Sequence, residues 1–376
     1  MEIDRLVQLT ALAVFSVNAA LMAALILLKV AHRKWMARHE ERRQRYIGTL
    51  SRHLSYENCT DPITASMAED PAFLDALIDM RNAITGDEIS TLRRIVDRHG
   101  MVERQVRRLE TSFPLGRRLR AAVALAEIGD ETAAPALMRY LDDREPEIRI
   151  QCARGLGRIQ WTPAIDPIAW RFHIETPWVR ARFSDTLIGF GAKATWPLLA
   201  YIRINHRFET KGPVMALRTL AQIQDQQAVG PLLDILELTN DLEVEIASIE
   251  ALGELGNPEA LLALLSRLDS ERWELRAKSA SALAGVGEPA ALAPLRRMLR
   301  DQNWWVRRSA AAAMAKLPGG IEALYDALGD ADLYAADAAA EALTDAGEVV
   351  ATSWTVEDSI ETEPVLAHMA VEGTAS

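Results

Sequence analysis

One motif recurs through this chain at a nearly constant interval. Its clearest copy is VRRSAAAAM at 306–314, where Arg307 is followed by Met314 seven residues later and Leu317 ten residues later. Equivalent frames open every 29 to 33 residues, at Arg118, Arg149, Arg180, Pro213, Glu245, Arg276, Arg307 and Ala336. Self-similarity at a period of this size indicates a tandem array in which each unit stacks on the next.

Each unit contains two helical patterns separated by a short turn. Apolar residues spaced by three and four positions mark one buried face of a helix. Glycines are predicted in the turns, at Gly129, Gly191, Gly256 and Gly287, and prolines in the first turn of the second helix, at Pro135, Pro197, Pro231 and Pro294. A proline there loses no hydrogen bond. Helices of about ten residues are unstable alone, so neighbouring units must bury a common core.

The strings that carry this pattern, D…VR..A..AL…G….A…L…L, are clearest at 301–317 and 143–156. They resemble the HEAT repeat, in particular the short bacterial type also called PBS-lyase HEAT-like. The resemblance covers about residues 115–347 and implies an all-α fold, a right-handed α-solenoid of about seven to eight helical pairs. It is specific for fold and says little about function. Units four, five and eight depart from it because they lack the arginine.

The resemblance also assigns a structural role to the repeat arginines. These are Arg118, Arg149, Arg180, Arg276 and Arg307. An aspartate precedes two of them by six residues, Asp143 before Arg149 and Asp301 before Arg307. We expect each such pair to tie the turn between helices to the second helix.

The N-terminal segment predicts a membrane anchor within residues 1–30. Residues 6–28, LVQLTALAVFSVNAALMAALILL, contain four polar residues and no charge. At about 1.5 Å per residue this run spans the roughly 30 Å hydrocarbon core of a bilayer. A cleaved signal peptide would have a basic start and a small-residue cleavage site. Because the chain starts MEIDR, a permanent transmembrane helix is the preferred interpretation.

The residues after this run are strongly basic, KVAHRKWMARHEERRQR. Positive flanks stay on the cytoplasmic side, so we expect a single-pass inner (plasma) membrane protein with its N-terminus outside and its repeats in the cytoplasm. Residues 31–54 are predicted to form a basic juxtamembrane helix. Four of its cations are candidates for contact with anionic lipid, namely Lys29, Arg33, Lys34 and Arg38. A solvated helix that only fixes the topology is the open alternative.

The rest of the chain divides into three predicted segments. Residues 55–115 are expected to be a helical cap or degenerate repeats, with helix starts at Asp70–Pro71 and Gly86–Asp87. Residues 116–347 are the repeats. Residues 348–376 carry six acidic residues and no lysine or arginine, and are expected to be largely disordered.

Several classes of function are disfavoured by composition. The net charge of -11 argues against a general nucleic-acid binder. The two cysteines, Cys59 and Cys152, have no zinc-ligand spacing, and no histidine stands in a metal-ligand pair. Motifs for phosphate-binding loops, dinucleotide binding, zinc proteases and nucleophilic serines are absent from the sequence. We therefore expect no catalytic residue, no metal and no cofactor.

One segment stands out as a candidate site for a protein partner. Nine of the 22 aromatic residues lie between Trp161 and Phe208, and residues 161–211 carry seven basic against four acidic residues. Aromatic residues and arginine are enriched at the centres of interfaces. The candidates are Trp161, Trp170, Trp178, Arg182, Trp196, Arg203 and Arg207. Alternatively, bulky side chains fill space where the regular leucine and alanine packing is lost.

Three further tryptophans, Trp273, Trp304 and Trp305, are expected in the turns just before repeat helices. They are either packed along a ridge or exposed to a partner. Taken together, these features favour a non-enzymatic, membrane-tethered scaffold or adaptor for a protein partner such as a membrane enzyme or an envelope-assembly complex. The alternatives are an enzyme subunit like the bilin lyases of the resembling family, and a regulatory adaptor that responds to a ligand.

Overall fold

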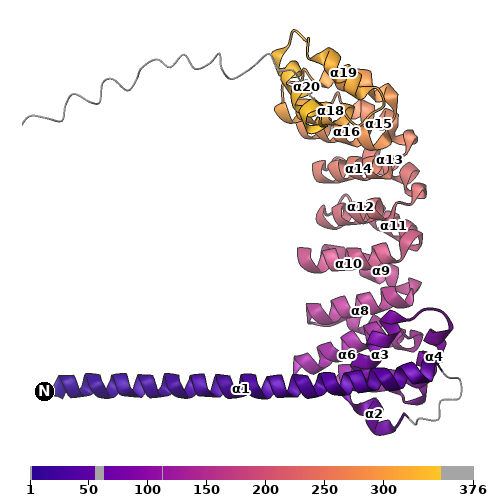
Figure 1. Cartoon of the computed structure of the whole chain (residues 1–376). Coiled ribbons are helices and arrows are strands. Elements are labelled where there is room, and N and C mark those ends of the chain that lie inside the picture. The colour runs from indigo at the N-terminus through magenta and orange to yellow at the C-terminus, as the bar shows by residue number, and fades with distance from the viewer. Residues whose placement is uncertain (1, 56–62, 112, 349–376) are drawn as a thin grey trace, which may run out of the picture. The chain divides into compact units, whose positions relative to one another are not determined.

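The computed structural model describes residues 2–55, 63–111 and 113–348, with side chains from Phe15 onward except that of Asp87. Every regular element in these ranges is a helix (Figure 1). The chain divides into two compact units, residues 1–168 and residues 169–376, which are described separately. Cys59 and almost all of the predicted acidic tail lie outside the described residues.

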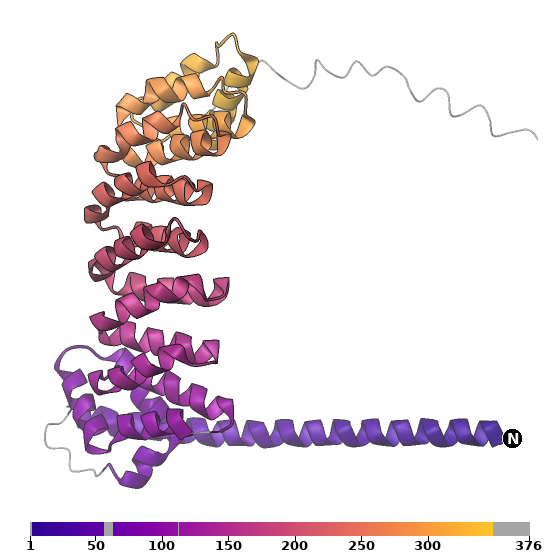
Figure 2. The same ribbon diagram turned by 180° about the vertical axis from the view of Figure 1, so that it is seen from behind.

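Unit one begins with a single helix, α1 (Glu2–Ser55), of 54 residues. The segments predicted separately as anchor and juxtamembrane helix are therefore continuous. From Phe15 onward this helix is long and apolar enough to cross a membrane, with a mean hydropathy of 1.7 over its apolar window. Its N-terminal half extends clear of the other helices of unit one (Figures 1 and 2).

The C-terminal part of α1 packs against α3 (Pro71–Ala83) through alternating charged and apolar contacts. His39 Nε2 lies 2.7 Å from Asp75 Oδ2, and Arg43 Nε donates to Asp79 Oδ2 at 2.5 Å. One helical turn later Tyr46 donates to Asp70 at 3.0 Å and meets the edge of the Phe73 ring. Asp75 and Asp79 of α3 thus bind His39 and Arg43 of α1.

Lys29, Arg33, Lys34 and Arg38 behave differently from these docked residues. All four are exposed, and they form no ion pair within the part of the chain that the structure describes. The basic segment after the apolar run therefore has two parts, a solvent-facing part and a part that docks on α3.

Four helices separate α1 from the first repeat. They are α2 (Ala65–Glu69), α3, α4 (Asp87–Arg98) and α5 (Met101–Thr111). The predicted helix starts are confirmed, because Asp70 caps α3 and Gly86 precedes α4. The repeats of unit one follow as α6 (Leu115–Ile128), α7 (Ala134–Arg139) and α8 (Pro146–Ile159), and α5 packs along α6.

Unit two continues the helical pairs. We call the first helix of each pair, which carries the periodic motif, the A helix, and the second the B helix. The A helices are α10 (Pro177–Gly189), α12 (Lys211–Ile223), α14 (Leu242–Leu255), α16 (Trp273–Val286), α18 (Trp304–Met314) and α20 (Leu333–Asp345). The B helices are α11 (Thr195–Asn205), α13 (Val229–Leu238), α15 (Leu261–Arg267), α17 (Leu292–Met298) and α19 (Gly320–Ala327). Helix α9 (Ile165–Trp170) is also a B helix, and its residues fall on both sides of the boundary between the units.

The buried core follows the predicted period. The residue seven positions after each motif start has no exposed surface in any unit, at Leu125, Leu156, Leu187, Leu220, Leu252, Leu283, Met314 and Leu343. All eight are Leu or Met, and burying a side chain of this size contributes about 1.5–3 kcal/mol.

In several repeats the turn after the A helix contains a residue with a left-handed backbone conformation. Gly129, Gly256 and Gly287 adopt positive φ there, as predicted, with φ of 63°, 64° and 76°. Gln160 and Gln224 take the same conformation in their repeats, with φ of 59° and 60°. A non-glycine residue in this region is uncommon, so the geometry of the turn is imposed by the packing on either side of it.

Consecutive A helices of unit two pack side by side, and two glycines lie where α14 meets α16. A Cβ added at Gly253 would lie 2.7 Å from Ala282 Cα, and one at Gly285 would lie 2.0 Å from the Gly253 carbonyl oxygen. Neither neighbour is a flexible side-chain end, so these glycines permit the contact between the two helices.

We predict that Gly253→Ala lowers the free energy of unfolding although alanine is the better helix former. Within a helix, replacing glycine by alanine ordinarily gains about 0.5–1 kcal/mol. At Gly253 the added methyl collides with the α16 backbone, and forced overpacking costs about 1–3 kcal/mol. Chemical denaturation of the full chain in detergent measures the change.

Gly189→Ala is the matched control, because a Cβ there meets nothing within 4 Å near the end of another A helix, α10. This variant should be neutral or more stable than the parent. Equal stability gains at both positions would contradict the close approach of α14 and α16.

Candidate interaction surface

The repeat arginines bind the backbone of the turn that precedes their own helix. Arg149 Nη1 donates to the carbonyl oxygens of Asp143 and Arg144, at 2.9 and 3.2 Å. Arg307 makes the same pair of bonds to Asp301 and Gln302, at 3.0 and 3.2 Å. The expected tie between each aspartate–arginine pair and the turn is therefore made through the main-chain oxygen of the aspartate.

The aspartate carboxylate instead binds the arginine of the preceding repeat. Arg276 donates to both oxygens of Asp301, from Nε at 2.7 Å and from Nη2 at 2.8 Å. Asp143 accepts from Arg118 Nη2 through one oxygen, while Arg118 Nε donates to the Leu109 carbonyl. Burial raises the pKa of Asp301, but the hydrogen bonds from Arg276 and from the Asn303 N–H outweigh it and hold that pKa below its ordinary value. Each aspartate thus links two repeats.

The irregular repeats use other groups for this link. Arg180 is buried, donates to the Glu175 carbonyl at 2.9 Å and reaches the Lys211 carbonyl of the next repeat at 3.4 Å. Where the motif has Glu245, the charge is reversed and Arg267 of the B helix donates to it at 2.8 Å. These arginines are held by backbone and carboxylate acceptors, which gives them structural roles.

The aromatic residues between 161 and 208 divide into two groups. Phe172, Phe183, Phe190 and Tyr201 are buried in the core of unit two, as the packing alternative requires. Trp170, Trp178, Trp196 and Phe208 are exposed by 40%, 52%, 57% and 83%. Trp161, which belongs to unit one, is half-buried.

Three of the exposed aromatics lie in or beside two successive turns that lead from a B helix to the next A helix. The first turn contains Ile174 and is flanked by Trp170 at the end of α9 and Trp178 at the start of α10. The second turn contains Phe208 and follows Ile204 near the end of α11, and all five residues are exposed. We call these five residues the 170/208 surface. Arg203, Arg207 and Lys211 on the second turn are also exposed and form no ion pair in the described part of the chain.

Contacts beneath the surface hold the two turns together. The Trp170 ring meets the edge of the Tyr201 ring with a centroid distance of 5.5 Å. Tyr201 donates to Glu209 in the second turn at 2.7 Å, and burial, with the Glu209 hydrogen bond, raises the pKa of Tyr201. Arg180 joins Glu175 of the first turn to Lys211 of the second. These contacts fix the two turns relative to each other, so the five apolar residues lie on an ordered part of the fold.

Two predicted partner-binding residues lie apart from the 170/208 surface. Trp196 is the second residue of α11, about 12 Å of helix away from Ile204. Arg182 lies on α10 and pairs with Asp185 at 3.2 Å. Sequence reasoning missed Ile174, Ile204 and Phe208 as site residues. The long linker NHRFETKG, which interrupts the repeat spacing, was the available signal for Phe208.

The three C-terminal tryptophans form a second exposed group, but not in turns. Trp273 begins α16, and Trp304 and Trp305 begin α18, so the expectation that they precede their helices is wrong. Asn303, whose side chain accepts from the Trp305 N–H, caps α18. Arg308 lies over the Trp304 ring at 5.4 Å, and all three tryptophans remain partly exposed. Ridge packing and partner contact are both compatible with this arrangement.

The described residues offer little for catalysis. No group of three or more histidine, cysteine or acidic side chains among them could hold a metal ion. Cys152 is fully buried, and burial raises the pKa of its thiol, which disfavours the reactive thiolate.

Comparison with known proteins identifies the repeats. A family model of HEAT repeats matches residues 107–187, 203–273 and 261–344, which together exceed half of the chain. A search of curated proteins found no match.

Solved structures share the fold at low sequence identity. A crystal structure of a Kap121p mutant has a TM-score of 0.50 and 13% identity, covering 73% of this chain and 36% of that chain. The Kap95p structure with RanGDP has a TM-score of 0.49 and 11% identity, covering 76% and 46%. Human deoxyhypusine hydroxylase has a TM-score of 0.28 and 19% identity, covering 82% and 98%. The chain thus spans less than half of either Kap protein, and the predicted all-α solenoid of helical pairs is confirmed.

Proposed function

Because the chain belongs to the HEAT-repeat family, we propose that it is a membrane-tethered scaffold that binds a protein partner through the 170/208 surface. In this proposal its repeats are of the short PBS-lyase HEAT-like type, which the repeat strings support. In this proposal residues 55–115 cap the first repeat, which is supported by the packing of α5 along α6. The protein is not an enzyme in this proposal, because its exposed groups form surfaces for contact rather than a converging set of reactive side chains.

The membrane tether is supported by the order of features along α1. An apolar run comes first, four exposed cations without ion-pair partners follow, and docking on α3 begins at His39. Leu28 and His39 are eleven residues apart, which is about 16 Å of helix. Lys29, Arg33, Lys34 and Arg38 then lie at the depth of the lipid headgroups, where each basic residue near an anionic surface contributes about 1 kcal/mol.

The partner site is supported most directly by the exposure of Trp170, Ile174, Trp178, Ile204 and Phe208 on two mutually fixed turns. Exposed apolar groups that cluster in this way mark interaction sites more often than scattered ones. The unpaired cations beside them indicate a partner that presents apolar side chains next to acidic groups. Tethering raises the effective concentration of a membrane partner, so a modest interface suffices.

The tether predicts a defined topology. The full chain should stay with the membrane fraction in alkaline carbonate and be released by detergent. A tag at the N-terminus should be accessible to antibody on intact cells, whereas a tag at the C-terminus should become accessible only after lysis. A carbonate-soluble chain that lacks its first thirty residues would contradict the anchor, and inverted tag accessibility would contradict the orientation.

The surface predicts a selective loss of partner binding. The double variant Trp178→Ser and Phe208→Ser should weaken the affinity of the purified partner by at least tenfold, because loss of one interface anchor of this kind costs more than about 1.4 kcal/mol. The partner is the stoichiometric protein that co-purifies from detergent-solubilised membranes, and its dissociation constant is then measured with purified proteins.

Trp304→Ser with Trp305→Ser is the matched control, since it removes two exposed tryptophans from another surface of the same unit. That variant should bind as the parent does. Retained binding in the first variant, or equal loss in both, would reject the 170/208 surface as the site.

A further inference from the structure

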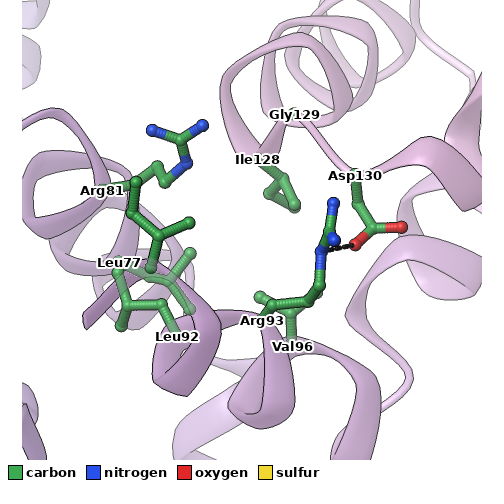
Figure 3. Close-up of a pocket in the computed structure, with 9 residues that line it drawn as sticks. Leu77, Arg81, Leu92, Arg93, Val96, Ile128, Gly129 and Asp130 are labelled. Atoms are coloured by element: carbon green, nitrogen blue, oxygen red, sulfur yellow. Dashed lines mark ion pairs between the residues drawn. The ribbon is translucent and has the colours of Figure 1, made fainter. Parts of the chain in front are cut away.

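A small pocket in unit one is lined by two arginines. It lies between α3, α4 and the turn that follows α6, and it encloses about 40 Å³. Leu77, Leu92 and Val96 form its apolar floor, while Arg81 of α3 and Arg93 of α4 flank it on opposite sides (Figure 3). The proposed partner surface of unit two plays no part in this pocket.

Arg93 is only partly neutralised. Its Nε lies 3.1 Å from Asp130 Oδ2 in the turn after α6, and its side chain is half-exposed. The other Asp130 oxygen accepts from the main-chain N–H and the hydroxyl of Thr132, at 2.9 and 2.6 Å. Asp130 thus receives three donors, and only Nε of Arg93 is engaged, so both Nη nitrogens of Arg93 can donate to a further acceptor.

Arg81 makes no ion pair or hydrogen bond within the described residues, although its side chain is partly buried. Burial lowers the pKa of Arg81, and repulsion from Arg158 and Arg93 lowers that pKa further. Glu127 is the nearest compensating charge, but it already pairs with Arg154 at 2.7 Å and with Arg158. All five N–H donors of Arg81 are thus available.

The cluster around the pocket has an uncompensated charge. Arg81, Arg93, Arg154 and Arg158 interact with two carboxylates, Glu127 and Asp130, and within this set of described residues the positive charges exceed the negative ones by two. Like charges held together in a partly buried site are unfavourable unless an anion joins them. Guanidinium groups offer forked donors that match the oxygens of phosphate.

We propose that the pocket between Arg81 and Arg93 binds a phosphate monoester group. A phosphate monoester carries up to two negative charges near neutral pH, which matches the excess, and its oxygens point in several directions and can meet donors from opposite walls. A flat carboxylate with one charge matches neither feature. The group comes either from a free phosphate compound or from a phosphatidic-acid headgroup, since both present the same chemistry.

The test uses the full chain in nanodiscs of phosphatidylcholine, titrated with inorganic phosphate and followed by calorimetry. The parent should bind phosphate saturably at one site, and Arg81→Gln should weaken this binding at least tenfold. Because Arg81 has no partner to lose, the variant should keep the melting temperature of the parent in phosphate-free buffer. Phosphate should raise the melting temperature of the parent and not that of the variant.

Arg94→Gln is the control, because Arg94 is exposed on the same helix, bonds only to Thr91 and does not line the pocket. Its phosphate affinity should stay within twofold of the parent. A second set of nanodiscs containing phosphatidic acid separates the two sources. If phosphatidic acid in these nanodiscs competes with inorganic phosphate and weakens its binding, the ligand is the lipid headgroup. If the phosphate affinity is unchanged, the ligand is a free phosphate compound.

Three results would overturn the proposal. These are the absence of saturable phosphate binding up to 20 mM, undiminished binding in Arg81→Gln, and equal loss in Arg94→Gln. None of them affects the partner surface, whose variants lie in unit two.

Discussion

The fold depends on the packing of one A helix against the next. Helices of six to fourteen residues do not hold their shape alone in water, so each repeat helix depends on its neighbours to bury its apolar face. Between α14 and α16 this contact is made backbone to backbone, with Gly253 and Gly285 where other helices have side chains. Repeats built in this way are stabilised mainly by their interfaces with neighbouring repeats.

Hydrogen bonds and ion pairs between repeats add to this packing, and they differ between the regular repeats and the repeats that carry the proposed binding surface. In regular repeats an arginine secures its own turn and an aspartate reaches back to the preceding repeat, as with Arg276 and Asp301. In the repeats around residues 170–211, Arg180 is buried and binds two carbonyl groups, Glu175 before its own helix and Lys211 in the next repeat. Trp178 and Phe208 lie in the same repeats and are exposed.

The two units also differ in net charge, and the first unit carries the proposed membrane anchor. Residues 1–168 carry 24 basic and 23 acidic residues, whereas residues 169–376 carry 18 basic and 30 acidic residues. An anionic lipid surface repels the acidic composition of the second unit and has little effect on the near-neutral first unit. The chain thus has its near-neutral unit next to the proposed anchor and its acidic unit further along the sequence.

The sequence predicts those features that depend on local periodicity and fails on those that depend on contacts between repeats. Leu252 and Gly256 could be placed because a helix period and a left-handed turn leave local signals. The arginine that binds the Asp301 carboxylate could not be predicted. The sequence offers one arginine 25 residues earlier and another six residues later, and nothing in the sequence distinguishes them. Burial of Tyr201 beside an exposed Trp170 was likewise unpredictable, since both are aromatic residues in one irregular segment. The docking of His39 on Asp75 also depends on tertiary geometry that the spacing of cations does not show.

Hydrogen exchange along the full chain in nanodiscs tests most directly whether the repeats stabilise one another. If they do, the amides of α14 and α16, each with an A helix on both sides, should exchange slowest in unit two. Those of α20, which packs against α18 on one side within the described residues, should exchange fastest among the A helices. Equal protection of α20 and α14 would show that each helical pair is stable by itself, and would contradict the account.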